Sequence, residues 1–156
     1  MIDFCMHHNF GNAAAAFDIK KYDDTYNDAT WNVVYVDSHD YGPNNTGGLE
    51  KRFDGDQATL AENMTLMFTF RGIPTLYYGT EIQFQKGSQI DASGRSKIPF
   101  AQSGRAYYGA NIEGSVTASS FGSYDSASGA VKATLDHPLA KHIARLNQIR
   151  RAVPAL

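Results

Sequence analysis

The stretch VVYVDSHDYGPNN, residues 33–45, decides how the fold is interpreted. It begins with a continuous apolar and mostly β-branched run at residues 33–36 and then changes abruptly to two carboxylates, a serine and a histidine at residues 37–40. A strand without polar alternation is typical of a parallel sheet that is covered on both faces. Ligands of parallel α/β sheets bind at the carboxyl ends of the strands, so we expect residues 37–40 to lie at the functional edge.

The pattern on either side of this stretch predicts repeated βα units. We expect short strands at residues 1–8 and 73–78, and helices at residues 12–20, 56–70 and 137–153. The last helix is the clearest, because Leu139, Ile143, Leu146, Ile149 and Val153 recur at helical spacing. The order of elements predicts one α/β domain, residues 1–156, with parallel strands. A small flavodoxin-like open sheet is the alternative fold.

Residues 80–136 form the least patterned part of the sequence. They are rich in Gly, Ser and Ala and have no sustained period of either kind. We therefore expect a long loop between the last strand and the last helix. A loop of this length in a compact domain is commonly functional.

Composition excludes several classes of protein. The 156 residues carry a formal net charge of −2, and the basic residues are scattered, so nucleic acid is not an expected partner. No apolar run is long enough to cross a bilayer, and we expect no membrane partner. The single cysteine, Cys5, cannot form an internal disulfide. His7 and His8 are adjacent on a predicted strand and would point to opposite faces, so no metal site is assigned.

A second polar cluster follows the strand at residues 73–78, at Thr80 and Glu81. If the two strands are neighbours, their ends lie about 5 Å apart, and Asp40 and Glu81 could border the same cleft. Polar residues after a strand can also serve only as turn residues. We favour that structural role for Asp37 and Ser38 and a functional role for His39 and Asp40. Glu81 could either contact a ligand or hold a loop.

Several motifs resemble those of the α-amylase family, glycoside hydrolase family 13. The segment YVDSHD at residues 35–40 resembles the motif ending the seventh barrel strand, with Ser38 where the family usually has Asn. GIPTLYYGTE at residues 72–81 resembles the eighth-strand signature G-x-P-x-x-x-Y-G-x-E. HPL at residues 137–139 and LNQIRRAVPAL at residues 146–156 are similar to the last barrel helix, and MIDF at residues 1–4 to the sixth strand. This order implies a partial (β/α)8 TIM barrel comprising about the last three βα units.

The resemblance also implies a mechanism. Family members are retaining enzymes that act on α-1,4-glucosidic bonds of starch or maltooligosaccharides, with a carboxylate nucleophile and a carboxylic general acid. Asp40 matches neither; it matches a third carboxylate that stabilises the transition state. His39 matches a residue that donates a hydrogen bond to a substrate hydroxyl. Further substrate contacts are implied for Tyr41, Asn44, Glu81 and His8.

The same comparison indicates what the chain lacks. The family's nucleophile motif G-x-R-x-D does not occur, and no Glu is a candidate for the general acid at the end of a fifth strand. A complete barrel takes about 250 residues. We therefore expect a C-terminal portion of a larger enzyme, inactive alone, whose partner is the missing N-terminal half of the barrel or a second copy of the chain.

Several properties remain open at this stage. The resemblance implies secretion, although the chain shows no signal peptide, and it implies calcium only in a complete enzyme, so no cofactor is assigned. A glucanotransferase of the same family shares these motifs. A non-catalytic carbohydrate-binding or structural α/β module is the alternative from another class.

Overall fold

A computed structural model of the chain describes residues 1–7, 13–19, 28–38, 53, 56–84, 109–119 and 123–156. Strands β1 (Val33–Val34) and β2 (Ile73–Pro74) pair in parallel, with Val33 opposite Ile73. Ile2 joins the other side of β1 as a parallel bridge to Val33. Three parallel segments therefore lie side by side in the order in which they occur along the chain. The fold is mixed α/β with a small parallel sheet, and the described segments form an open layer.

The predicted strand at residues 1–8 is wrong beyond Ile2, because the chain turns into helix α1 (Phe4–His7). Asp3 causes the change: its Oδ1 accepts a hydrogen bond from the Met6 N–H at 2.9 Å, as a helix-capping side chain does. Arg71 holds the other oxygen of the same carboxylate, with Nη2 at 3.2 Å from Oδ2. Asp3 is fully buried, and these two contacts supply partners to its two oxygens.

The predicted helices between the parallel segments are confirmed. Helix α2 (Ala13–Asp18) follows α1, and helix α3 (Gln57–Thr69) precedes β2. A short 3-10 helix, η2 (Ala29–Trp31), leads into β1. Helix α3 begins at Asp56, whose carboxylate accepts from the Thr59 N–H at 2.7 Å. The pKa of Asp56 is lowered chiefly by this backbone hydrogen bond.

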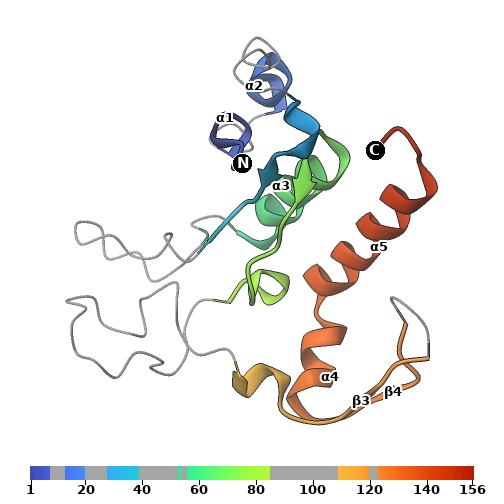
Figure 1. The fold of residues 1–156 in the computed structure, drawn as a ribbon. Helices are drawn as coiled ribbons and strands as arrows, with labels where there is room; N and C mark the ends of the chain where they lie inside the picture. Colours follow the sequence, from blue (N-terminus) through green and yellow to red (C-terminus); the bar gives the residue numbers. More distant parts are fainter. Residues whose placement is uncertain (8–12, 20–27, 39–52, 54–55, 85–108, 120–122) are drawn as a thin grey trace, which may run out of the picture.

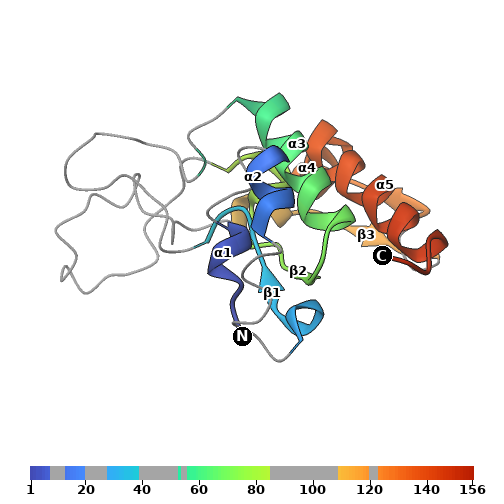
Figure 2. The same ribbon diagram turned by 90° about the horizontal axis from the view of Figure 1, so that it is seen from above.

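Helix α5 (Pro138–Ala152) confirms the predicted last helix and packs against α3. His137 caps it, with Nδ1 accepting from the Leu139 N–H at 3.2 Å. Both helices lie on the same side of β1 and β2 (Figure 2). The core between them and the sheet consists mainly of aliphatic and methionine side chains: Met6, Ala16, Ile19, Val34, Leu60, Met64, Met67, Phe68, Leu139, Ile143 and Leu146.

The two faces of the sheet are buried to different extents. Val34 faces the helices and is fully buried. The paired residues Ile2, Val33 and Ile73 lie at one register level and therefore point to the same, opposite face. Ile2 is 39% exposed and Ile73 is 46% exposed. Among the described elements, helices cover only the Val34 face, and Val33 on the other face is half-buried. The described residues thus show cover for one of the two faces expected for residues 33–36.

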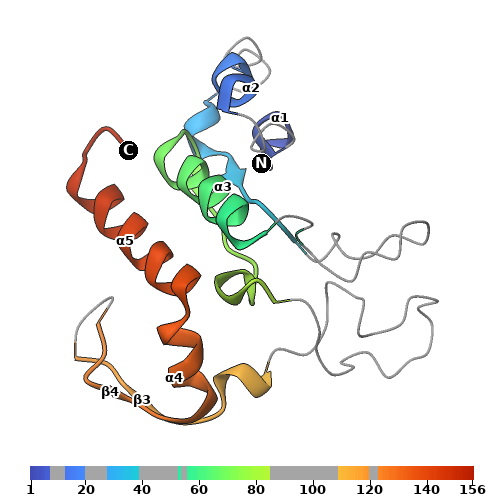
Figure 3. The same ribbon diagram turned by 180° about the vertical axis from the view of Figure 1, so that it is seen from behind.

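Residues 80–136 contain more regular structure than the long loop predicted. Their described parts include η3 (Thr80–Ile82), η5 (Gly109–Ile112), the antiparallel hairpin β3 (Val116–Thr117) and β4 (Ser126–Ala127), and helix α4 (Gly129–Asp136). The hairpin and α4 lie at the end of the molecule away from α1 and α2 (Figures 1 and 3). Gly114 allows the segment before β3 to lie close to the backbone of Ser128, because a Cβ at residue 114 would lie 2.1 Å from the Ser128 carbonyl oxygen. The sequence did not predict β3 and β4, because each strand has two residues and such short strands produce no periodic hydrophobic pattern.

Among the described residues, no helix is both long enough and apolar enough to cross a membrane.

Candidate active site at the carboxyl ends of the parallel segments

The carboxyl ends of β1 and β2 are joined by a buried hydrogen bond. The Thr80 hydroxyl donates to Asp37 Oδ1 at 2.5 Å, and the same oxygen of Thr80 lies 2.7 Å from the Tyr77 carbonyl oxygen. Thr80 is fully buried and Asp37 is 3% exposed. Water therefore competes little for this contact, and a short bond to a carboxylate is strong in such surroundings. The structural role expected for Asp37 is consistent with this arrangement.

A compact turn, Tyr77–Phe84, follows β2 and presents Glu81. Within this turn, Gly79 directly precedes η3 and has a φ of 87°, a conformation that favours glycine. Its carbonyl oxygen then accepts from the N–H groups of both Ile82 and Phe84, at 3.1 Å and 2.9 Å. Phe84 is buried against Tyr78 and Ile82. The turn is thus fixed by its own backbone bonds and a small apolar cluster, and α5 packs against η3 from the side.

Aromatic side chains flank this turn. The rings of Tyr77 and Tyr78 lie 4.4 Å apart between centroids, tilted by 52°. Both side chains are half-buried, as is Tyr35, which directly follows β1.

The structure describes one of the six predicted site residues. Glu81 lies in η3 and is half-buried at the carboxyl end of β2. His39, Asp40, Tyr41, Asn44 and His8 lie outside the described residues. The described chain reaches Ser38, directly before His39 and Asp40. The hydrogen bond between Asp37 and Thr80 therefore holds the segment that precedes His39 and Asp40 next to the segment that contains Glu81.

Sequence reasoning overlooked Thr80 as the partner of Asp37. The signal was present, because Thr80 follows Gly79 at the end of one parallel strand while Asp37 ends its neighbour. Choosing Thr80 over Ser38 or Tyr77 as that partner required the register of β1 against β2. A one-residue shift would have moved these side chains to other faces.

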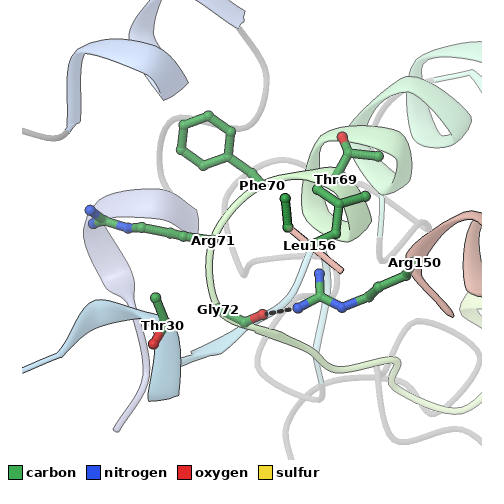
Figure 4. Close-up of a pocket in the computed structure, with 8 residues that line it drawn as sticks. Thr30, Thr69, Phe70, Arg71, Gly72, Arg150 and Leu156 are labelled. Carbon is green, nitrogen blue, oxygen red and sulfur yellow. Dashed lines mark hydrogen bonds between the residues drawn. The ribbon is translucent and has the colours of Figure 1, made fainter. Parts of the chain in front are cut away.

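A hollow of about 430 Å³ lies at the opposite, amino ends of the strands. Figure 4 shows two arginines on its wall: the Arg150 side chain points toward Gly72, and the Arg71 side chain points away from Gly72. Arg150 donates to the carbonyl oxygens of Phe68 and Gly72 at 2.8 Å and 2.7 Å, and Arg71 is bonded to Asp3. Arg150 thus holds the end of α3 and the residue before β2, while Arg71 ties the turn between them to Asp3. We assign this hollow a structural role.

Metal binding finds no support in the described ranges: no group of three or more His, Cys, Asp or Glu side chains there could hold an ion.

Comparison with known proteins adds no assignment: no family model, no curated protein and no solved structure matches the chain.

Proposed function

We propose that the chain forms the last three βα units of an α-amylase-type (β/α)8 barrel and contributes His39 and Asp40 to an α-glucan site. In this proposal Asp40 stabilises the oxocarbenium-like transition state of a retaining glycosidase, and His39 donates a hydrogen bond to a substrate hydroxyl. Tyr41, Asn44, Glu81 and His8 supply further substrate contacts. The bond cleaved is an α-1,4-glucosidic bond of starch or a maltooligosaccharide.

The Asp37–Thr80 hydrogen bond is the observation that carries the proposal. It joins the two segments whose motifs resemble the family's seventh and eighth strands, at the edge where parallel α/β folds bind ligands. Asp40 is three residues after Asp37, so its Cα lies within about 11 Å of that anchor by chain geometry alone. Glu81 directly follows Thr80. The bond therefore allows both carboxylates to border one cleft.

The parallel order of the segments also supports the proposal. Ile2, β1 and β2 neighbour each other in chain order, as the sixth, seventh and eighth strands of a barrel would. In the row Ile2, Val33 and Ile73, on the face opposite Val34, Ile2 and Ile73 are partly exposed and Val33 is half-buried. The interior of a barrel is filled by layers of such branched side chains from all its strands. An incomplete barrel would leave this row uncovered.

The experiment measures hydrolysis of a chromogenic α-maltooligoside by the purified chain, with its intact mass confirmed. The chain alone is expected to give no turnover, because the motifs for the nucleophile and general acid are absent. Adding a polypeptide that carries the family's first five barrel units is expected to restore turnover. Asp40→Asn should then lower kcat by about 10²-fold or more.

Matched controls separate the site from general effects. Glu62→Gln removes one carboxylate from the exposed side of α3 and should leave the restored turnover unchanged. Turnover by the chain alone that disappears in Asp40→Asn would overturn the assignment of a missing nucleophile. Saturable maltooligosaccharide binding without turnover in any mixture would instead identify a carbohydrate-binding module. Chain lengthening among the products would identify a glucanotransferase.

A further inference from the structure

A single residue, His137, forms the joint between helices α4 and α5 (Figure 1). Its backbone N–H donates to the Thr134 carbonyl oxygen at 3.2 Å and ends α4, while its carbonyl oxygen accepts from the Lys141 N–H at 3.0 Å. Its half-buried ring begins α5, with Nδ1 accepting from the Leu139 N–H at 3.2 Å. A residue with a titratable side chain therefore joins the two helix ends.

The ring bond is specific to one protonation state of His137. A ring nitrogen that accepts a hydrogen bond carries no hydrogen, so the neutral ring carries its hydrogen on Nε2. Nε2 lies 3.3 Å from the side-chain amide nitrogen of Gln57. Turning that amide by 180° places its oxygen there instead, as the acceptor that an Nε2–H group requires. The neutral ring thus links the start of α5 to the start of α3.

A proton added to Nδ1 removes the acceptor of the Leu139 N–H. The first N–H groups of a helix have no partners within it, and Leu139 is only 1% exposed, so water replaces the ring poorly. His137 lies at the C-terminal end of α4 and the N-terminal end of α5, so the two helix dipoles act on the added charge in opposite senses. The lost hydrogen bond therefore decides the sign of the effect.

The surrounding charges do not hold the protonated ring. The charged groups of α4, of the first turns of α5 and α3, and of η3 are Lys132, Asp136, Lys141, Asp56 and Glu81, and η5, which packs against α4, contains none. Asp136 bonds to Lys132 and pairs with Lys141, and Asp56 caps α3. Within the described ranges, none of these carboxylates is bonded to the His137 ring.

We propose that His137 makes the joint between α4 and α5 acid-sensitive: the neutral ring caps α5, and the charged ring releases its first turn. Histidine is the side chain whose charge ordinarily changes between about pH 5 and 8. In the unfolded chain His137 takes up its proton without losing a hydrogen bond, so acid disfavours the folded joint. The stabilisation is present at neutral pH and is lost as the pH falls through the titration of His137. This inference is independent of the proposed glycosidase role.

The test compares the Tm of the 156-residue chain at pH 7.5 and pH 5.5, a range in which histidines titrate and ordinary carboxylates stay charged. His137→Asn keeps a capping oxygen and has no charge to gain. The decrease in Tm on acidification should be about 2–6 °C smaller in His137→Asn than in the parent chain. Each variant is compared with itself at two pH values, so a general loss of stability in the variant cancels.

His142→Gln is the matched control on the same helix. His142 Nε2 lies 3.0 Å from Thr65 Oγ1 and 3.1 Å from the Ala61 carbonyl oxygen. The Thr65 hydroxyl already donates to that carbonyl oxygen at 2.8 Å, so Nε2 of His142 is the donor in its contacts. A proton added to the other ring nitrogen leaves this donation in place. His142→Gln should therefore keep the decrease in Tm within about 1 °C of the parent's.

Amide NMR spectra of the parent chain supply a second measurement. On acidification the Leu139 amide proton should move to lower chemical shift, as expected for an N–H group that loses its acceptor, and this movement should be absent in His137→Asn. Three results would each overturn the inference: a decrease in Tm as large in His137→Asn as in the parent, an equal reduction of that decrease in His142→Gln, or a Leu139 amide signal that stays in place.

Discussion

At the scale of single residues, buried polar contacts determine how the strand ends are joined. Asp37 and Asp3 are both buried carboxylates, and each is held by a side chain from the region around β2: Thr80 for Asp37 and Arg71 for Asp3. A buried carboxylate costs free energy unless hydrogen bonds replace its hydration. Removing one partner should therefore cost more than the hydrogen bond alone is worth.

Thr80→Val removes the hydroxyl that donates to Asp37 and keeps the shape of the side chain. The free energy of unfolding is expected to fall by about 2–3 kcal/mol, because a buried carboxylate loses a hydrogen bond. Thr80→Ser keeps the hydroxyl and should lose less. Thr75→Val is the matched control, since its exposed hydroxyl has one weak contact, 3.3 Å from the Ile73 carbonyl oxygen. Urea denaturation that gives equal losses for Thr80→Val and Thr75→Val would contradict the role of Thr80.

Asp56 is expected to make the stability of α3 depend on pH. Its pKa is lower in the folded chain than its ordinary value of 3.8, chiefly because the Thr59 N–H donates to the carboxylate. The stabilisation is therefore present above pH 4 and is lost as the pH falls through the lowered folded pKa. Asp56→Ala should lower the melting temperature at pH 7, and the difference from the parent chain should shrink near pH 2.5. Asp56→Asn keeps a capping oxygen and should retain stability at pH 7.

At the scale of elements, one side chain of α5 closes the end of α3. Arg150 donates to the carbonyl oxygens of Phe68 and Gly72, which lie on either side of the turn into β2. The last carbonyl groups of a helix have no partners within it, so this arginine supplies one. Gly72 itself is required there, because a Cβ would approach the Asn32 carbonyl oxygen to 2.9 Å. Arg150 therefore links α5 to both the end of α3 and the residue before β2.

Arg150→Met keeps much of the aliphatic side chain and removes both hydrogen bonds. The free energy of unfolding is expected to fall by about 1.5–3 kcal/mol. Arg150→Lys should recover part of this loss, since an ammonium group lacks the planar fork that spans two oxygens. Arg145→Met, an exposed residue of the same helix, should change stability by less than about 0.5 kcal/mol. Chemical denaturation in which Arg145→Met costs as much as Arg150→Met would contradict the clamp.

At the scale of the whole molecule, the described helices cover one side of the parallel sheet. Val34 packs into the helical core, whereas Ile2 and Ile73 remain partly exposed on the other face. A row of apolar side chains on an open sheet favours association with further strands. The proposed barrel would supply those strands, and a second copy of the chain could cover the same row.

Ile73→Thr should therefore change association more than folding. The isolated chain is expected to lose less than about 1 kcal/mol, because Ile73 is already 46% exposed. Val34→Thr, on the adjacent strand but fully buried, should lose about 1–3 kcal/mol. Sedimentation velocity should show weaker self-association for Ile73→Thr, or weaker binding to the missing half-barrel. Unchanged association in both assays would contradict the assignment of this face as an interface.

The sequence by itself determined the elements whose causes are local. The spacing of Leu139, Ile143 and Leu146 specifies the inner face of α5, Asp56 and Pro138 mark helix starts, and Gly72 with Pro74 ends α3. These features depend on helical periodicity and capping, which act over a few residues. The strands at β1 and β2 were predicted from short apolar runs bounded by polar residues or glycine, and their parallel pairing from the order of strands and helices along the chain.

Only the tertiary structure decided which side chains meet. The partnership of Asp37 with Thr80, 43 residues apart, depends on the register of β1 against β2. Local pattern could not identify α1, because it forms from a buried Asp3 whose second oxygen is held by Arg71, 68 residues away. Such contacts are selected by the free energy of the whole packed chain, since each becomes favourable only after the others have excluded water.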